Sequence, residues 1–342
     1  SNDNIRCIIR ENSGNLWIGT RNGLNYYDTT TRKIKQYFYQ PDDPNSIGSN
    51  YIRTIYEDRQ GTIWLGTEAG GLNRYNREKD HFIRYTHTGS DKNSLSNNRV
   101  YSVFEDRTGN LWVGTYKGVN KINKYTNDFR LFQQGQHGLN SNFIWGFDQD
   151  RAGNVWIGTS EGINILHKKT GKFTQLLHIP GNPNSLADDE VRTLLYSPDQ
   201  HCFWFGLYGT GLDQYDMDTK SFRHYTPSAS KNSLSDPYVN DLLLDSYGYL
   251  WIATGRGLNR FDPDSNQFRN YYNDPGDPGS LCNDIVICLF EDSKQNLWIG
   301  TNKGLSKYDR KTKSFTSYFH NENERLNHNT IFYITEDSYG KI

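Results

Sequence analysis

Apolar residues in this chain occur in short runs that polar turns separate, and the clearest set spans residues 52–85. β-Branched and aromatic residues fill four runs in this stretch, which are Ile52–Glu57, Thr62–Thr67, Gly71–Tyr75 and His81–Tyr85. Runs of this length, bounded by Gly, Asp and Asn, are typical of β-strands. Because the turns between them are short, the pattern predicts four antiparallel strands joined by hairpins.

The same set of runs recurs along the chain, and a tryptophan marks each copy. Repetition at a fixed period predicts one repeat architecture rather than two separate domains. Four antiparallel strands repeated around an axis form a β-propeller blade, and such rings have roughly four to eight blades. The sequence therefore predicts an all-β fold, a seven-bladed β-propeller of four-stranded antiparallel blades. Its tryptophans, expected to pack between blades, follow one another at intervals of 44 to 48 residues: Trp17, Trp64, Trp112, Trp156, Trp204, Trp251 and Trp298.

The repeat also sets the expected boundaries. Residues 1–328 account for the seven blades, and residues 329–342 restart the first run of an eighth repeat. We therefore expect an extra C-terminal strand, and we expect the natural protein to continue into a second propeller. The passages between blades, such as the one from Tyr85 to Val100, are long and polar, as a crossing from one sheet to the next requires.

Composition narrows the class of partner. The 38 basic and 39 acidic residues nearly cancel, so no global field would recruit nucleic acid or an anionic membrane. No stretch approaches the roughly 18 consecutive apolar residues that a membrane span needs. The apolar fraction is only 34%, but aromatic residues reach 14%, which indicates a core rich in rings.

Cysteine and histidine spacing predicts no metal site and no cofactor. The four cysteines Cys7, Cys202, Cys282 and Cys288 show no CxxC spacing, and the nine histidines form no ligand pair. Cys7 and Cys288 share one repeat position, which leaves a bridge between them as the alternative. We favour free buried thiols, because equivalent positions of adjacent blades tend to be too far apart for a disulfide.

One motif connects the chain to a known family. Glu57–Tyr75 reads EDRQGTIWLGTEAGGLNRY, and Glu105–Ile122 and Glu291–Tyr308 repeat much of it. The motif resembles the two-component regulator propeller repeat over all seven copies. Two copies depart from it, at Ser197–Leu207 and at Trp251–Thr254.

The resemblance implies a function and a set of partners. In that family such repeats form the periplasmic sensor of hybrid two-component systems in Gram-negative gut bacteria. Two propellers, an immunoglobulin-like module, a membrane helix, a histidine kinase and a response regulator typically follow one another. The resemblance therefore implies a periplasmic, non-catalytic sensor, homodimeric at full length in the inner membrane, that detects oligosaccharides and regulates polysaccharide utilisation.

The candidate binding residues are those that vary within this constant frame. In a propeller of this connectivity, the crossings and the second turns of the blades share one face, and variable loops on a constant scaffold are typical of recognition. Aromatic rings beside Arg and Asn suit a sugar, which has an apolar ring face and hydroxyl edges. The residues that follow the first apolar position of the first run are Arg6, Arg53, Tyr101, Trp145, Arg192 and Asn240, and those in the second turns include Arg21, Tyr116, Tyr208 and Arg256.

Two other functions stay open at this point. Glu68, Glu161 and the run Asp188–Glu190 could supply the paired carboxylates of a propeller lyase or glycoside hydrolase, although acidic turn residues are usually solvated. The third possibility is a dimerisation scaffold that binds no small molecule. No catalytic residue is assigned, because no two of these carboxylates have a defined separation in the sequence.

Overall fold

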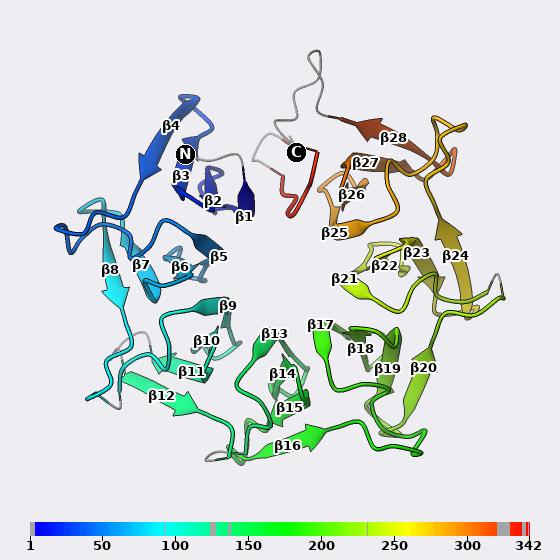
Figure 1. Ribbon diagram of the computed structural model, residues 1–342, viewed down its shortest axis with the longest axis horizontal. Coiled ribbons are helices and arrows are strands. Elements are labelled where there is room, and N and C mark those ends of the chain that lie inside the picture. Colours follow the sequence, from blue (N-terminus) through cyan, green and yellow to red (C-terminus); the bar gives the residue numbers. More distant parts are fainter. Residues whose placement is uncertain are drawn as a thin grey trace. The chain divides into compact units, whose positions relative to one another are not determined.

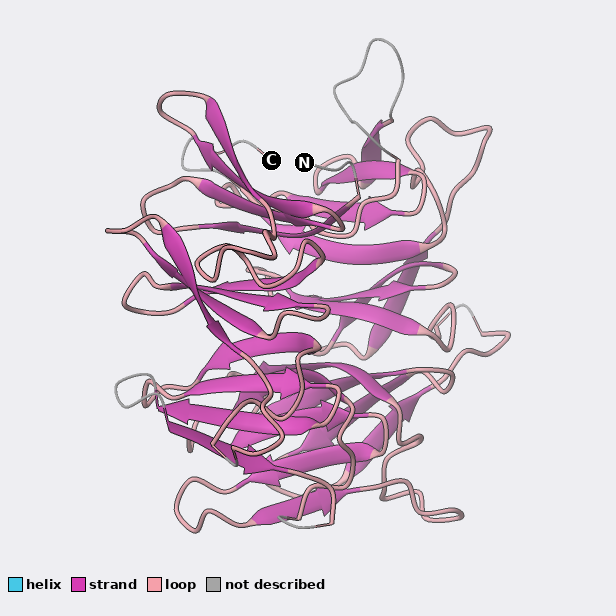
Figure 2. Cartoon of the chain, turned by 60° about the vertical axis from the view of Figure 1, so that its left-hand side comes forward, coloured by secondary structure: helices cyan, strands magenta, loops and turns pink. Residues whose placement is uncertain are grey.

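The computed structural model describes residues 4–91, 93–123, 128–135, 138–230, 232–319, 329–336, 340 and 342. These residues contain strands and loops, and none of the described residues is helical (Figure 2). The 28 strands form seven sheets of four, so the fold is the seven-bladed β-propeller that the repeat predicts. The chain divides into two compact units, of which the first ends at Gln175 and the second begins at Leu176.

The first unit holds blades 1 to 4, which Figure 1 labels in chain order. Their strands are β1 (Ile5–Arg10), β2 (Leu16–Thr20), β3 (Gly23–Asp28) and β4 (Lys33–Tyr37) in blade 1; β5 (Ile52–Glu57), β6 (Ile63–Thr67), β7 (Leu72–Asn76) and β8 (His81–Tyr85) in blade 2; β9 (Val100–Glu105), β10 (Leu111–Thr115), β11 (Gly118–Asn123) and β12 (Asp128–Phe132) in blade 3; and β13 (Ile144–Gln149), β14 (Val155–Thr159), β15 (Gly162–Leu166) and β16 (Phe173–Leu176) in blade 4.

The second unit holds blades 5 to 7. Their strands are β17 (Val191–Ser197), β18 (Cys202–Leu207), β19 (Leu212–Asp216) and β20 (Phe222–Tyr225) in blade 5; β21 (Val239–Leu244), β22 (Leu250–Thr254), β23 (Gly257–Asp262) and β24 (Gln267–Tyr271) in blade 6; and β25 (Val286–Glu291), β26 (Leu297–Thr301), β27 (Gly304–Asp309) and β28 (Ser314–Tyr318) in blade 7.

Each blade is an antiparallel meander in which consecutive strands pair. Within each unit the first strands of neighbouring blades also lie against one another, as β1 does against β5 and β21 against β25. The second strand of a blade packs on the first strand of the next, as β6 does on β9. We call the first strand of each blade its inner strand.

The tryptophans form the core between blades, as predicted. Trp64 of blade 2 packs with Val100, Val103 and Leu111 of blade 3, and Trp251 of blade 6 packs in the same way on blade 7. Trp17, Trp64, Trp112, Trp204 and Trp251 are among the largest fully buried side chains. Large rings bury much area per residue, which explains how a chain with few apolar residues builds a core.

In six of the seven blades a carboxylate accepts the indole N–H of the tryptophan. The same carboxylate shapes the turn between the first and second strands of its blade. In blade 2, Asp58 accepts the indole N–H of Trp64 at 3.0 Å and the backbone N–H groups of Gln60 and Thr62 at 2.9 and 3.0 Å. Gly61 closes this turn with φ 78°, where a Cβ would be strained. The equivalent indole bond joins the pairs Trp17–Glu11, Trp112–Asp106, Trp156–Asp150, Trp251–Asp245 and Trp298–Asp292.

Blade 5 departs from this arrangement. Val191 pairs in this blade as Ile52 does in blade 2, so Ser197 stands at the position of Asp58, and the turn that follows it is one residue longer. The indole nitrogen of Trp204 is therefore buried with no hydrogen-bond partner among the described residues. A buried N–H without a partner destabilises the folded state.

The described part of the C-terminal segment, residues 329–336, contains no strand, so the prediction of an extra C-terminal strand is wrong. The segment nevertheless packs on blade 7 as an inner strand would. Ile331 donates to the carbonyl of Thr301 at 2.9 Å, and Glu336 accepts from the N–H of Ser293 at 2.7 Å, as Glu57 does from Asn12 at 2.8 Å.

All four cysteines are free and buried, which confirms the prediction of free thiols. Burial raises the pKa of the Cys7 thiol to about 12 and that of Cys202 to about 11. These thiols are therefore protonated near neutral pH and poor nucleophiles.

Candidate ligand-binding face

Each inner strand begins with a β-bulge at the same repeat position. In β5, Ile52 pairs with Thr67 and Thr54 pairs with Gly66, so Arg53 is the extra residue. The same register shift occurs in the other six inner strands. A bulge residue leaves the ladder, and its side chain is directed away from the regular alternation. This position is occupied by predicted site residues in six blades: Arg6, Arg53, Tyr101, Trp145, Arg192 and Asn240.

The second turn of each blade lies against the loop that enters the inner strand, as the sequence predicts. The N–H of Glu68 donates to the carbonyl of Tyr51 at 3.0 Å, and the N–H of Tyr116 donates to the carbonyl of Arg99 at 3.0 Å. The equivalent bonds join Arg21 to Asn4, Ser160 to Phe143, Tyr208 to Glu190, Gly255 to Tyr238, and Asn302 to Ile285.

Three guanidinium groups surround the ring of Tyr51 in the first unit. Arg6, Arg21 and Arg53 lie 5.9, 5.7 and 5.3 Å from the ring centroid. Arg53 also lies 4.8 Å from the ring of Tyr101. Cations at these distances are attracted to the face of a tyrosine ring. Residues of blades 1, 2 and 3 thus meet in one cluster.

Glu68 fixes two arginines of this cluster. Its carboxylate accepts the Nε–H of Arg53 and pairs with Nε of Arg99 at 2.7 Å. A hydrogen bond with Tyr101 and the charge of Glu68 raise the pKa of Arg99, whose guanidinium also lies 5.2 Å from the ring of Tyr116. Glu68 therefore links the positive cluster to the aromatic group beside it.

That aromatic group consists of Tyr101, Tyr116, Phe143 and Trp145. The ring of Phe143 lies 6.0 Å from Tyr101, 4.7 Å from Tyr116 and 6.0 Å from Trp145. Trp145 lies 6.2 Å from Tyr101, and Tyr116 is 39% exposed. The group joins blades 3 and 4 and places ring surface next to guanidinium groups. We call the two sets together the first-unit cluster. Its members are Arg6, Arg21, Tyr51, Arg53, Glu68, Arg99, Tyr101, Tyr116, Phe143 and Trp145.

In the second unit the predicted residues form a smaller group. The guanidinium of Arg192 lies 4.2 Å from the ring of Tyr208 and 2.5 Å from Glu190. Tyr208 makes an edge contact with Tyr238 at 4.8 Å, and both rings are more than two fifths exposed, at 45% and 44%. This pair of exposed tyrosines is a second, more open aromatic surface.

The remaining two predicted residues lie apart from that group. Asn240 donates its amide to the carbonyl of Val286 at 2.7 Å, so it links blades 6 and 7. Arg256 is exposed in the second turn of blade 6, where its N–H donates to Thr254. Packing between blades therefore accounts for Asn240.

Sequence reasoning missed Tyr51, Arg99 and Phe143. Each stands directly before the first apolar residue of an inner strand, and this position varies between copies as the bulge position does. This variation between copies could have identified the three residues as candidates from the sequence. The missed residues connect the first-unit cluster, because each contacts at least two of the predicted residues.

The acidic residues weighed as catalytic carboxylates have structural contacts. Glu68 binds two arginines, Glu161 accepts from the amide of Gln134 at 3.2 Å, and Glu190 pairs with Arg192. Asp188 and Asp189 accept backbone N–H groups at 2.9 and 2.6 Å. Within the described ranges, no group of three His, Cys, Asp or Glu could hold a metal ion.

Comparison with protein families gives one match. The profile of the two component regulator propeller family matches residues 1–22, 46–69, 94–117, 138–161, 233–256 and 280–303. Residues 162–232, which include blade 5, have no match, and in this blade Ser197 stands in place of the carboxylate. No curated protein matches the chain.

Solved structures share the fold. The extracellular domain of a candidate one component system from B. thetaiotaomicron aligns over 99% of this chain and 49% of its own, with a TM-score of 0.65 and 20% identity. The extracellular domain of a candidate hybrid two component system from the same organism aligns over 95% of this chain and 54% of its own, with a TM-score of 0.51 and 22% identity. Virginiamycin B lyase from Staphylococcus aureus aligns over 87% and 92%, with a TM-score of 0.60 and 13% identity.

The chain thus spans about half the length of the two extracellular domains. Among the described residues, none belongs to a helix with the length and apolar character that a bilayer crossing demands.

Proposed function

Because six repeats of the chain match the two component regulator propeller family, we propose that it is a sensor propeller of a hybrid two-component system and that it binds oligosaccharides. The likeness to extracellular domains of such systems supports this proposal. On this proposal the chain acts outside the cytoplasm, in the periplasm, without catalysing a reaction itself. A histidine kinase elsewhere in the full-length protein would carry the signal and regulate polysaccharide utilisation.

The observation that carries the proposal is the first-unit cluster. Aromatic rings offer flat apolar surface to the C–H face of a sugar, and guanidinium groups donate to hydroxyl or carboxylate oxygens at its edge. Tyr51, Tyr101 and Trp145 supply the rings, while Arg53 and Arg99 supply donors held in place by Glu68. Groups held in place before binding lose less conformational freedom on binding.

The proposal includes partners as well as a ligand. A second propeller and an immunoglobulin-like module of the same full-length chain would receive the signal, and the full-length sensor would be a homodimer. Stiff blades favour movement at the boundaries between modules over deformation within a blade. Sedimentation of the full-length extracellular region, with and without ligand, tests this part of the proposal.

A thermal-shift screen against a panel of plant and host oligosaccharides tests ligand binding. A ligand that binds the folded state raises the melting temperature, and product analysis of the same mixtures shows whether it is cleaved. We expect a saturable rise without cleavage. Trp145→Ala and Arg53→Ala should weaken binding at least about fivefold, since anchor residues in binding sites carry more than about 1 kcal/mol each.

Arg256→Ala is the matched control, because it removes an exposed arginine outside the first-unit cluster. Its affinity should equal that of the unaltered chain. Equal affinity in all three variants would show that the first-unit cluster is not the site. Cleavage of a panel member would favour a propeller lyase or hydrolase instead, and no shift with measurable self-association would favour a scaffold.

A further inference from the structure

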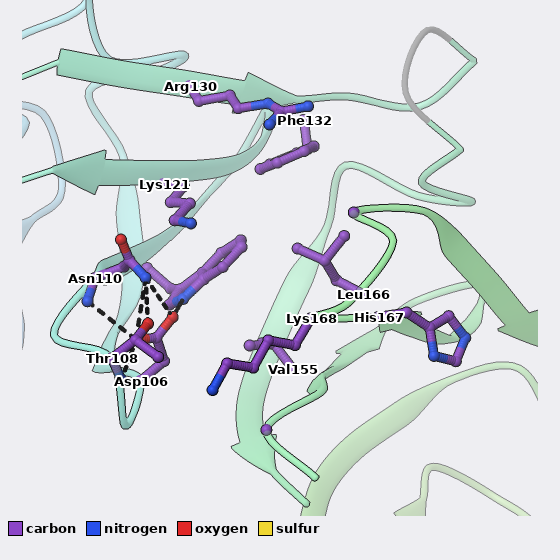
Figure 3. Close-up of a pocket in the computed structure, with 13 residues that line it drawn as sticks. Asp106, Thr108, Asn110, Lys121, Arg130, Phe132, Val155, Leu166, His167 and Lys168 are labelled. Carbon is purple, nitrogen blue, oxygen red and sulfur yellow. Dashed lines mark hydrogen bonds between the residues drawn. The ribbon is translucent and has the colours of Figure 1, made fainter.

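A pocket of about 100 Å³ lies between blades 3 and 4, away from the first-unit cluster. Blade 3 lines it with the Asp106 turn, Trp112, Lys121 and Arg130, and blade 4 lines it with Gly153 and Lys168, among others. Figure 3 shows Lys121 and Arg130 above the turn that carries Asp106, while Lys168 reaches toward that turn from the opposite blade. Both blades belong to the first unit.

Other seams of the propeller fill the equivalent place with an ion pair. Lys168 occupies the repeat position of Arg77 in blade 2 and Arg310 in blade 7. Arg77 pairs with the carboxylate of Glu11 in blade 1. Arg310 pairs with Asp245 in blade 6 at 2.8 Å and with Glu291 at 2.8 Å. In both seams an arginine of one blade binds the carboxylate that holds the tryptophan of the preceding blade.

The seam between blades 3 and 4 lacks this ion pair, and polar groups of blade 3 itself hold Asp106. Its Oδ2 accepts the amide of Asn110 and the indole of Trp112, both at 2.9 Å, and its Oδ1 accepts the hydroxyl and N–H of Thr108 at 2.6 and 2.9 Å. Burial alone would raise the pKa of Asp106, but these hydrogen bonds lower it. Both oxygens of Asp106 therefore have hydrogen-bond partners without a cation.

The three cations of the pocket have no ionic partner among the described residues. Lys121 lies 5.5 Å from the ring of Trp112, and Arg130 lies 5.0 Å from the ring of Phe132. The stem of Lys168 lies over Gly153, since a Cβ on that glycine would stand 2.8 Å from the lysine Cδ. His167 also lines the pocket, but its Nε2 is within 2.8 Å of the Thr174 hydroxyl.

The geometry points to an oxyanion site: we propose that this pocket binds a sulfate or phosphate group, free or carried by a larger molecule, through Lys121, Arg130 and Lys168. The three positive charges and the one negative charge of Asp106 leave two uncompensated positive charges in the pocket, which a dianion would balance. The volume, about three times the roughly 30 Å³ of a water molecule in the liquid, suits a group of this size. Charge-assisted hydrogen bonds from lysine and arginine are the usual means of holding such oxygens.

The test measures melting temperature against sodium sulfate and sodium phosphate at constant ionic strength, with sodium chloride as reference. Sulfate stabilises folded proteins in general by exclusion from their surface, so only a rise that saturates at millimolar concentration and disappears in variants supports the site. We expect Lys168→Gln and Lys121→Gln each to weaken the apparent affinity about tenfold, because each removes one charge-assisted contact. Lys313→Gln, on an exposed turn of blade 7, is the matched control and should change nothing.

Two further measurements separate the possible outcomes. Without added anion, Lys168→Gln should be as stable as the unaltered chain or slightly more stable, since it removes one of three positive charges that repel one another. A loss of stability would mark Lys168 as a structural residue and overturn the proposal. A sulfated disaccharide that binds more tightly than inorganic sulfate, with its desulfated form inactive, would identify a carried group as the ligand, whereas equal affinity would identify the free ion. Equal responses in all variants would also overturn the proposal.

The site is independent of the first-unit cluster. Trp145→Ala should keep the response to sulfate, and Lys168→Gln should keep any response to a neutral oligosaccharide. Loss of the sulfate response in Trp145→Ala would show that the two effects share one site, contrary to the proposal.

Discussion

The two units build the same blade from the same repeat, but they differ in how far their variable residues join. In the first unit the bulge and turn residues of four blades form one connected set of rings and guanidinium groups. In the second unit Arg192 contacts its own blade, and Asn240 serves a backbone carbonyl. The same blade fold thus does not by itself produce a connected cluster of variable residues. Such a cluster forms only where the side chains of neighbouring blades can contact one another.

The units differ in their cores as well. The four repeat tryptophans of the first unit, Trp17, Trp64, Trp112 and Trp156, donate to a buried carboxylate, whereas Trp204 of the second does not. Blade 5 also replaces an asparagine found in five other blades with Asp213, which pairs with His224 at 2.7 Å. Asp213 still accepts the N–H of Ala187 at 2.9 Å, as Asn73 accepts that of Gly48. Blade 5 therefore keeps the packing of the repeat with altered polar contacts.

The largest difference between the units is expected from removing a carboxylate. Glu11→Ala deprives the buried indole of Trp17 and the guanidinium of Arg77 of their acceptor. We expect a loss of about 3 kcal/mol in the free energy of unfolding, since uncompensated buried polar groups are costly. Ser197→Ala, at the same repeat position in blade 5, removes a buried hydroxyl that has no hydrogen-bond partner among the described residues, and its effect should stay within about 1 kcal/mol. Urea denaturation measures both, and equal losses would remove the distinction between the units.

A smaller difference is expected from shortening the tryptophan itself. Trp112→Phe and Trp204→Phe remove the same ring volume, but only the first leaves a carboxylate without its donor. The loss of unfolding free energy should be about 2 kcal/mol larger for Trp112→Phe. Subtracting one loss from the other isolates the hydrogen bond from the cavity. A difference near zero would mean that the indole bond contributes nothing to stability.

Ser197→Asp should bring blade 5 closer to the other blades. An aspartate at this position can accept the indole N–H of Trp204, as Asp58 does for Trp64. A gain of about 1 kcal/mol in unfolding free energy is expected, the usual net value of one hydrogen bond. Ser197→Asn supplies an uncharged acceptor as control. Destabilisation by both substitutions would show that the turn of blade 5 cannot adopt the common geometry.

The smallest expected effect is a dependence on pH confined to the second unit. The hydrogen bond from His224 to Asp213 raises the pKa of the histidine above its ordinary value of 6.5, although burial partly opposes the shift. The protonated form therefore stabilises the folded state fully below pH 6.5, and this contribution is lost as the pH rises through the folded-state pKa. Hydrogen exchange in blade 5 should report faster local opening across this range.

Asp213→Asn is the control for this pH dependence, because it restores the residue of the other blades and removes the charge beside His224. The variant should show a flatter pH profile in blade 5. A profile that is unchanged in Asp213→Asn would mean that another group titrates there.

Much of the fold was predictable from the sequence, for a physical reason. The spacing of Trp64 and its equivalents reports a packing requirement that every blade shares, and the residue after the first apolar position is the bulge residue in each blade. The C-terminal strand was predicted wrongly, because residues 331–336 repeat the sequence pattern of an inner strand but do not form one.

The connections within the candidate site were less predictable. Tyr51, Arg99 and Phe143 end long polar loops that carry no strand pattern, so nothing local marked them as neighbours of Tyr101 or Trp145. Whether Arg53 turns toward Tyr51 or toward solvent depends on side chains from three blades. Such contacts are properties of the assembled unit rather than of one repeat.

The bulge at the start of each inner strand has a consequence for how these proteins diversify. Its residue takes no part in the ladder, so exchanging it leaves the pairing of the strand and the packing of the tryptophans untouched. Bulge residues of neighbouring blades contact one another, as Arg53 does Tyr101 and Tyr101 does Trp145, so these positions change together, and a library randomised jointly at these codons would sample new specificities on a scaffold that still folds.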